Sequence, residues 1–194
     1  GLAYVPSFGP ELVLGVSTYA HELFRAAGDL DVVYVPIGMG SGICGVIAAR
    51  DMLGLKTRVI GVVAEKAPAY ALSFAANTPM ATEDAITFAD GLAVRVANPD
   101  ALRIIKAGAE GIVTVGEKDM ADAMRLYFRC AHTVAEAAGA ARRARAARGI
   151  EEVTARAACG RKVLLPGSGA NGLLYSVDSV DFCRLRAARI FTSF

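Results

Sequence analysis

The strongest constraint on the fold is an apolar run that leads directly into a glycine-rich stretch. Residues 32–37 read Val-Val-Tyr-Val-Pro-Ile, and residues 38–45 read Gly-Met-Gly-Ser-Gly-Ile-Cys-Gly. A continuous, β-branched apolar run is typical of a strand that is buried on both faces of a parallel sheet. Glycines permit a tight turn with positive φ, so the chain can pass straight into a helix. We therefore expect a central parallel strand, a loop at 38–42 and a helix that ends at about Leu53, before Gly54.

Helix and strand patterns alternate along the rest of the chain. Apolar residues at three- or four-residue steps predict a helix over 10–27, and Asn98, Pro99 and Asp100 are typical of the start of another. The other expected elements are strands at 57–64, 112–115 and 162–165 and helices at 69–76, from 98 to Gly108 or Gly111, 117–130, 135–148 and 178–189, with mostly loop over 77–94. This alternation predicts an α/β fold: an open, mostly parallel sheet with helices on both faces, which binds ligands at the carboxyl ends of its strands.

Composition narrows the classes of partner. The chain has 194 residues, 54% of them hydrophobic, and this length suits one globular domain. A formal net charge of +2 gives no electrostatic case for nucleic acid or an anionic membrane, and Pro36 with four glycines would break a membrane helix in the uncharged run 32–49. The four cysteines form no Cys-x-x-Cys pair and are expected to be small buried residues. With no secretory signal pattern, we expect a reduced cytoplasmic protein whose ligand is a small molecule.

The glycine loop is the best candidate for a binding site. Its N–H groups can approach a ligand closely and the helix start adds partial positive charge, so a phosphate is the expected ligand; the alternative is a tight turn whose glycines serve packing. Gly40-x-Gly42-x-x-Gly45 also fits a dinucleotide fingerprint, with Glu65 standing 20 residues after Gly45 as a ribose-binding acid. A second hypothesis is therefore an NAD(P)-dependent oxidoreductase, although a full helix precedes the strand here. No Gly-x-x-x-x-Gly-Lys-Ser/Thr motif is present, which excludes a nucleotide triphosphatase of the P-loop kind.

Five stretches share their order and spacing with one enzyme family. They are Pro-Ile-Gly-Met-Gly-Ser-Gly at 36–42, Pro-Ser-Phe-Gly-Pro-Glu-Leu-Val-Leu-Gly at 6–15 with Thr18 and Glu22, Thr-Phe-Ala-Asp-Gly at 87–91, Val-Ala-Glu-Ala-Ala-Gly at 134–139, and Ser-Gly-Ala-Asn at 168–171. Together they resemble the serine/threonine dehydratase and serine racemase family of fold type II pyridoxal-phosphate enzymes. The resemblance implies that residues 1–171 are the large, cofactor-binding domain and that 172–194 form a divergent tail.

The resemblance also implies a role for each matched residue. The amides of five loop residues would hold the phosphate of pyridoxal 5'-phosphate: Gly38, Met39, Gly40, Ser41 and Gly42. Ser168 would bind the pyridine nitrogen and, as a neutral partner, leave it largely unprotonated, which in the family favours eliminating a β-hydroxyl. Asp90, Gly91 and Glu136 would lie near the ring. Taken without the resemblance, Glu136 is a solvated acid at a helix start and Asp90 a loop acid.

Several family features are missing from this chain. The lysine that forms the Schiff base has no counterpart, since none of the five lysines stands in the right context: Lys56, Lys66, Lys106, Lys118 and Lys162. The Ser-x-Gly-Asn loop that grips the substrate carboxylate is also absent, and both are expected upstream of Gly1. The family's divalent-cation site maps to Glu65 and the Ala69 carbonyl, but Ala71 stands where the second carboxylate belongs and leaves the site incomplete. Arginines at 142, 143, 145 and 148 replace a mostly alanine stretch and are expected on a solvated helix face.

The expected function is that of a threonine/serine ammonia-lyase. The intact protein, a homo-oligomer, would eliminate water from L-threonine or L-serine and give a 2-oxo acid and ammonia, with residues 1–194 inactive alone. The alternatives are the oxidoreductase built on Gly40, Gly42, Gly45 and Glu65, and a non-catalytic relative that binds a phosphate ligand.

Overall fold

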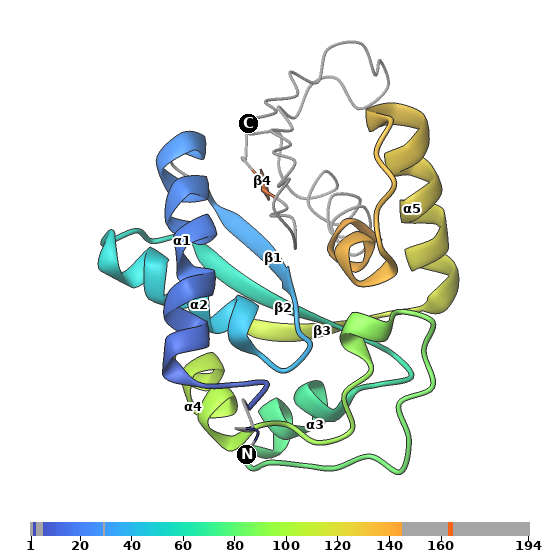
Figure 1. The fold of residues 1–194 in the computed structure, drawn as a ribbon, viewed down its shortest axis with the longest axis horizontal. Helices are drawn as coiled ribbons and strands as arrows, with labels where there is room; N and C mark the ends of the chain where they lie inside the picture. Colours follow the sequence, from blue (N-terminus) through green and yellow to red (C-terminus); the bar gives the residue numbers. More distant parts are fainter. Residues whose placement is uncertain (1, 3–5, 29, 145–162, 165–194) are drawn as a thin grey trace.

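The computed structural model describes residues 2, 6–28, 30–144 and 163–164, within which helices and strands alternate (Figure 1). The helices are α1 (Pro10–Ala27), α2 (Ser41–Met52), α3 (Ala69–Ala76), α4 (Pro99–Gly108) and α5 (Glu117–Ala131), with a 3-10 turn η1 (Asp90–Leu92) and a helical segment at 137–144. The strands are β1 (Val32–Pro36), β2 (Arg58–Ala64), β3 (Gly111–Val115) and β4 (Val163–Leu164).

These strands form one parallel sheet in the order β3-β2-β1-β4. Val33 of β1 pairs with Val59 of β2, and Val62 of β2 pairs with Val113 of β3. Because the strands run in the same direction, their carboxyl ends meet at one edge of the sheet. The glycine loop leaves β1 at this edge, and Glu65 follows β2 there.

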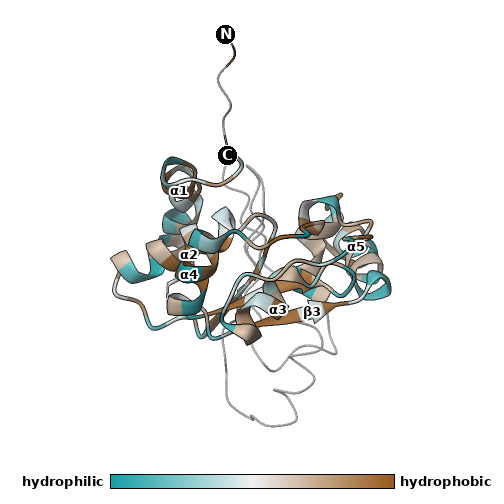
Figure 2. Ribbon diagram, turned by 90° about the horizontal axis from the view of Figure 1, so that it is seen from below, coloured by the Kyte–Doolittle hydropathy of each residue, from teal (hydrophilic) through white to brown (hydrophobic). Residues whose placement is uncertain are grey.

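Hydrophobic cores lie on both faces of the sheet. Val33, Val35, Val59 and Val63 belong to a core that also contains buried residues of α1, α2 and α4. Strand residues that point the opposite way, including Val62, pack with α5 and the segment 137–144. Figure 2 shows α1, α2 and α4 on one side of the strands and α5 on the other. The expected α/β fold, with an open parallel sheet covered on both faces, is confirmed.

The boundaries of the elements follow the local signals in the sequence. The Asn98 side chain caps α4 by accepting hydrogen bonds from the amides of Asp100 (3.0 Å) and Ala101 (3.1 Å). The segment 77–94 is mostly loop as expected, with η1 and a bridge between Ala81 and Val96 as additions. Of the helix expected at 135–148, residues 137–144 are described and helical, whereas the helix expected at 178–189 lies outside the described residues.

Two expectations about exposure need correction. Cys44 is buried as expected, but Cys130 is exposed because it lies in the last turn of α5, past the buried residues Met120, Ala123 and Tyr127. Arg142, expected on a solvated face, is only 5% exposed because its helical segment packs into the core. Cys159, Cys183, Arg145 and Arg148 lie outside the described residues. No helix in the described ranges has the length and apolar character needed to cross a bilayer.

Candidate functional site

The glycine loop connects β1 to α2 in a conformation that depends on glycine. The Ile37 amide donates to the Val62 carbonyl (2.9 Å), so the chain stays on the sheet up to the loop. Gly40, the N-cap of α2, has φ of 102°, in the left-handed region that favours glycine. A Cβ atom at Gly40 would lie 2.7 Å from the Cβ of Ala101, so the close approach of α4 also requires glycine there.

The N-terminus of α2 presents unpaired amides at this loop. Helical hydrogen bonding begins where the Cys44 amide donates to the Gly40 carbonyl (3.1 Å). The N–H groups of residues 40–43 precede this bond and have no partner within the helix, and no described side chain caps it. These donors and the partial positive charge of the helix end form a suitable site for an anion. The loop therefore fits the phosphate expected from the sequence.

Tyr70, a residue that sequence reasoning missed, fixes the shape of the loop. Its hydroxyl donates to the Met39 carbonyl (2.6 Å) and accepts a bond from the Asn98 amide (3.1 Å). The side chain is 1% exposed, and burial raises the pKa of Tyr70 to about 12, so the hydroxyl is a neutral donor at physiological pH. No sequence motif marks Tyr70, since its partners lie in other segments of the chain.

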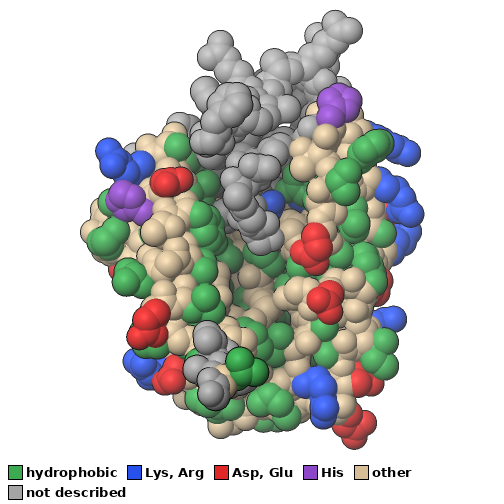
Figure 3. All heavy atoms as spheres, viewed as in Figure 1, with side chains coloured by type: hydrophobic (Ala, Val, Ile, Leu, Met, Phe, Trp, Pro, Cys, Tyr) green, Lys and Arg blue, Asp and Glu red, His purple; other side chains and the backbone are tan. Residues whose placement is uncertain are grey.

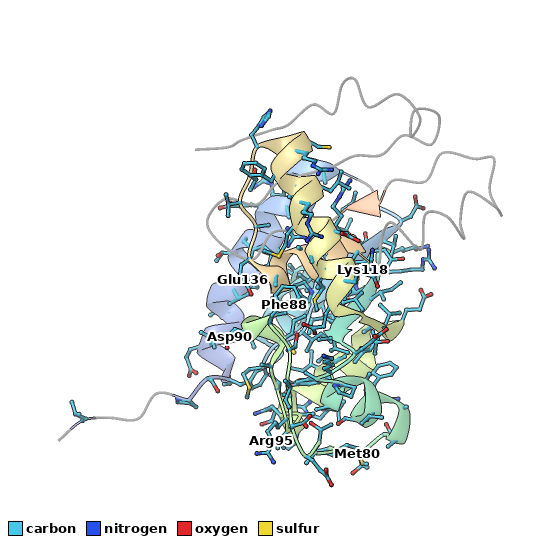
Figure 4. All side chains as sticks on the ribbon, turned by 90° about the vertical axis from the view of Figure 1, so that its right-hand side faces the viewer. Met80, Phe88, Asp90, Arg95, Lys118 and Glu136 are labelled. Carbon is cyan, nitrogen blue, oxygen red and sulfur yellow. The ribbon has the colours of Figure 1, made fainter. Side chains whose placement is uncertain are left out.

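Asp90, Gly91 and Glu136 converge on the same loop. A Cβ atom on Gly38 would collide with the carbonyl oxygen of Gly91, and a Cβ on Gly91 would lie 3.6 Å from Glu136 Oε1 and 3.0 Å from the Ala138 Cβ. The structure thus brings together residues 38, 91 and 136, which the sequence separates widely. Asp90 is exposed beside them, and Figure 4 shows Glu136, Phe88 and Asp90 close together, away from Arg95 and Met80.

Hydrogen bonds from α5 hold the η1 turn in place. Glu117, in the first turn of α5, accepts the Thr87 hydroxyl (2.7 Å) at one carboxylate oxygen and the Phe88 amide (3.1 Å) at the other. Glu136 also uses its carboxylate to hold a backbone amide, because its Oε1 accepts a hydrogen bond from the Ala138 amide (3.1 Å) at the start of the segment 137–144. The expected helix-start role of Glu136 is therefore observed together with its place at the loop. Ser168 lies outside the described residues.

A hollow lies on the face of the molecule where these segments meet. Figure 3 shows it between α1 and the region of α5, with hydrophobic side chains on its walls and acidic side chains along its α5 side. Blue atoms of a basic side chain are visible inside it.

The residues of the expected cation site are spread over two elements. Glu65 is exposed, with its Oε2 3.2 Å from the position of a Cβ on Gly116, whereas the Ala69 carbonyl accepts the Ser73 hydroxyl (2.6 Å). Ala71 lies in α3 and offers no side-chain oxygen. Within the described part of the chain, no three His, Cys, Asp or Glu side chains are grouped to hold a metal. The site at Glu65 and Ala69 stays a prediction.

The third glycine of the dinucleotide pattern has a packing role. A Cβ on Gly45 would lie 3.0 Å from the Ser17 backbone nitrogen, so this glycine lets α1 approach α2. The four lysines of the described residues are all exposed. Of these, Lys106 donates to the Phe74 carbonyl (3.0 Å) and Lys118 to Asp122. Lys162 lies outside the described residues.

Comparisons with known proteins all lead to one enzyme family. The profile of the family described as "Pyridoxal-phosphate dependent enzyme" matches residues 1–165. The L-threonine ammonia-lyase of Thermotoga maritima is 30% identical over 182 residues, which cover 93% of this chain and 44% of that protein. The phenylserine dehydratase of Ralstonia pickettii is 34% identical over 63% of this chain and 38% of its own length.

A solved structure extends the likeness to three dimensions. The processed form of threonine deaminase isoform 2 from Solanum lycopersicum superposes with a TM-score of 0.81 at 27% identity, over 95% of this chain and 51% of that one. The chain spans less than half the length of the two curated relatives.

Proposed function

Since this chain belongs to the pyridoxal-phosphate dependent enzyme family, we propose that residues 38–42 bind the phosphate group of pyridoxal 5'-phosphate. The observation that carries the proposal is the uncapped N-terminus of α2, whose free amides adjoin a glycine turn held by Tyr70. The first glycine of the pattern lies against Gly91, the second needs positive φ, and a Cβ on Gly42 would lie no closer than 4.0 Å to Tyr19 Oη. A dianionic group fits such a set of donors.

The neighbouring segments would position the rest of the cofactor. Asp90 and Gly91 would form one border of the site and Glu136 the next, while the Ser168 hydroxyl would donate a hydrogen bond to the pyridine nitrogen. Pyridoxal 5'-phosphate, when bound, supplies an electron sink for bond cleavage at the α-carbon of an amino acid. Residues 1–171 would form the cofactor-binding domain, with 172–194 as a divergent tail.

The activity proposed for the whole protein is elimination of water from L-threonine or L-serine, giving a 2-oxo acid and ammonia. Support comes from the similarity to an L-threonine ammonia-lyase, a phenylserine dehydratase and a threonine deaminase. The lysine amine that bonds to the cofactor would come from a part of the whole protein outside residues 1–194. The proposal includes an amino-acid substrate and a homo-oligomeric whole protein.

Equilibrium dialysis of residues 1–194 against pyridoxal 5'-phosphate tests the cofactor part of the proposal. Binding should be saturable, should be competed by inorganic phosphate and should be weaker for pyridoxal, which lacks the phosphate. Equal binding of both compounds would contradict a phosphate site at the loop. Saturable NADH binding that is lost in Glu65→Ala would favour the oxidoreductase instead.

Assays of 2-oxo acid release test the activity. Residues 1–194 with cofactor and L-threonine or L-serine should release none, whereas a longer form of the protein that carries the lysine and the Ser-x-Gly-Asn loop should be active. Turnover by residues 1–194 alone would contradict the inference that these residues lack the Schiff-base lysine. A longer form that binds the cofactor without turnover would identify a non-catalytic relative.

A further inference from the structure

Arg142 is a buried cation that lacks a partner among the described residues. Its side chain is 5% exposed, and its Nε and Nη1 atoms make no hydrogen bond. An arginine side chain remains protonated in proteins, so burial cannot be relieved by losing the charge. An uncompensated buried charge costs several kcal/mol. A negative group in contact with Arg142 would offset this cost.

Arg142 lies one helical turn after a residue that packs against Gly91, a neighbour of the glycine loop. Ala138 and Arg142 stand four residues apart in the segment 137–144, so they share one face of that helix. Ala138 faces Gly91, because a Cβ atom added at Gly91 would lie 3.0 Å from the Cβ of Ala138. The Gly91 carbonyl in turn lies against Gly38. Arg142 thus lies one turn beyond the contact that joins this segment to the loop.

Tyr19 lies beside the loop and is influenced by the charge of Arg142. Its hydroxyl oxygen is 4.0 Å from the position of a Cβ on Gly42. Burial raises the pKa of Tyr19 to about 12, and the positive charge of Arg142 acts against that rise. Tyr19 is therefore a neutral donor that lies beside the loop and within the field of Arg142.

We infer that Arg142 and Tyr19 are further phosphate-binding residues, which hold the cofactor phosphate together with the amides of α2. The inference rests on the proposed function of the loop and adds to it the source of the compensating charge. Amides carry only partial charges, whereas a guanidinium forms charge-assisted, bidentate bonds to a phosphate dianion. The dianion in turn supplies the negative group that buried Arg142 lacks.

The affinity ratio of pyridoxal 5'-phosphate to pyridoxal, measured by dialysis on residues 1–194, isolates this contribution. In Arg142→Met the ratio should fall about tenfold or more, with pyridoxal affinity unchanged, because a hydrogen-bonded charge is lost. Tyr19→Phe should lower it about threefold. Arg143→Met is the matched control: Arg143 lies next in the same helix, but its guanidinium lies over the Tyr127 ring, 5.6 Å from its centroid, so the ratio should be unchanged.

The outcomes separate the inference from the proposed function. A preserved ratio in Arg142→Met overturns the inference and leaves the loop as the phosphate site. A wild-type chain that binds neither compound overturns both. Inorganic phosphate that binds in an Arg142-dependent way while the cofactor does not would assign the pocket to free phosphate, which also overturns the inference as stated.

A measurement on the wild-type chain guards against a variant that does not fold. The ³¹P resonance of bound pyridoxal 5'-phosphate should stay at its dianion position below pH about 6, since a guanidinium lowers the second pKa of the phosphate. Arg142→Lys keeps the positive charge but loses the planar, bidentate guanidinium. Its bound cofactor should therefore keep the ³¹P resonance at the dianion position, with a smaller loss of affinity than in Arg142→Met. Titration of the wild-type resonance near the pH of the free compound would overturn the inference.

Discussion

The Tyr70 hydroxyl donates a 2.6 Å hydrogen bond to the carbonyl oxygen of Met39, 31 residues earlier in the chain. The oxygen of the Tyr70 hydroxyl also accepts a hydrogen bond from the amide of Asn98 (3.1 Å), which precedes α4. One buried phenol therefore ties the loop after β1 to α3 and to the start of α4. The conformation that turns the α2 amides outward depends on this tie as well as on the glycines.

Tyr70→Phe should weaken both folding and cofactor binding. Removing the hydroxyl leaves the Met39 carbonyl and the Asn98 amide without their partner, which should lower the free energy of unfolding by about 1–3 kcal/mol. Because the loop loses its tether, affinity for pyridoxal 5'-phosphate should fall several-fold in dialysis. Ser73→Ala, in the same helix, is the control: its hydroxyl bonds the Ala69 carbonyl and the Met80 amide, so only stability should fall. Equal affinity losses in the two variants would contradict a local role for Tyr70.

Gly40→Ala should disrupt the loop more than its size suggests. The residue has φ of 102°, and an added Cβ would lie 2.7 Å from that of Ala101, so strain and collision should together destabilise the fold by about 2–4 kcal/mol. Cofactor binding should be lost with the shape of the turn. Gly54→Ala is the control, since Gly54 also has positive φ (65°) but open space around it. A urea titration should show a loss of only about 1 kcal/mol in the free energy of unfolding, and cofactor binding should be unchanged. Retained binding in Gly40→Ala would show that the turn tolerates another shape.

The fold was predictable because its signals are local. Val32 to Ile37 are apolar without a break, Asn98 caps its own helix, and Gly54 follows the end of α2, so each element is specified by neighbouring residues. The parallel sheet then follows from their alternation. The family resemblance inferred from five ordered motifs is confirmed by the family match over residues 1–165.

The parts of the site that escaped prediction depend on contacts between distant segments. Tyr70 bonds Met39, and Glu117 bonds Thr87 and Phe88, 30 and 29 residues away, at positions without a motif. The burial of Arg142 was missed because a run of arginines ordinarily lies on a solvated face, and only packing shows which member turns inward. Periodicity gives the face of a helix but not the groups that cover it.

Alkaline pH should destabilise the protein in a defined window. Burial raises the pKa of the Cys44 thiol from 9.0 to about 12 and that of Tyr70 from 10.0 to about 12. The unfolded chain then loses these protons at lower pH than the folded one, so their stabilising effect is complete below pH 9.0 and is lost progressively up to about 12. The slope should be about 1.4 kcal/mol per pH unit for each group.

Urea titrations at several pH values check this window. The free energy of unfolding should begin to fall above pH 9.0 in the wild type and only above pH 10.0 in Cys44→Ala. Cys130→Ala removes an exposed thiol and should keep the wild-type onset. An onset that is the same in both cysteine variants would contradict the assignment to Cys44.

Glu136→Ala should release the start of the segment that carries Arg142. The carboxylate accepts the Ala138 amide at 3.1 Å, and loss of such a cap lowers the free energy of unfolding by about 1 kcal/mol. Glu136→Gln keeps an oxygen acceptor and should lose only the charge at the helix start, about 0.3–1 kcal/mol. Because the cap holds the helix turn before Arg142, the affinity ratio of cofactor to pyridoxal should fall in the alanine variant and persist in the glutamine variant. Glu110→Ala, which breaks an exposed pair with Arg58, should leave that ratio unchanged. If the ratio falls equally in Glu136→Gln, the carboxylate charge itself acts on the bound ligand, and its role as a cap is secondary.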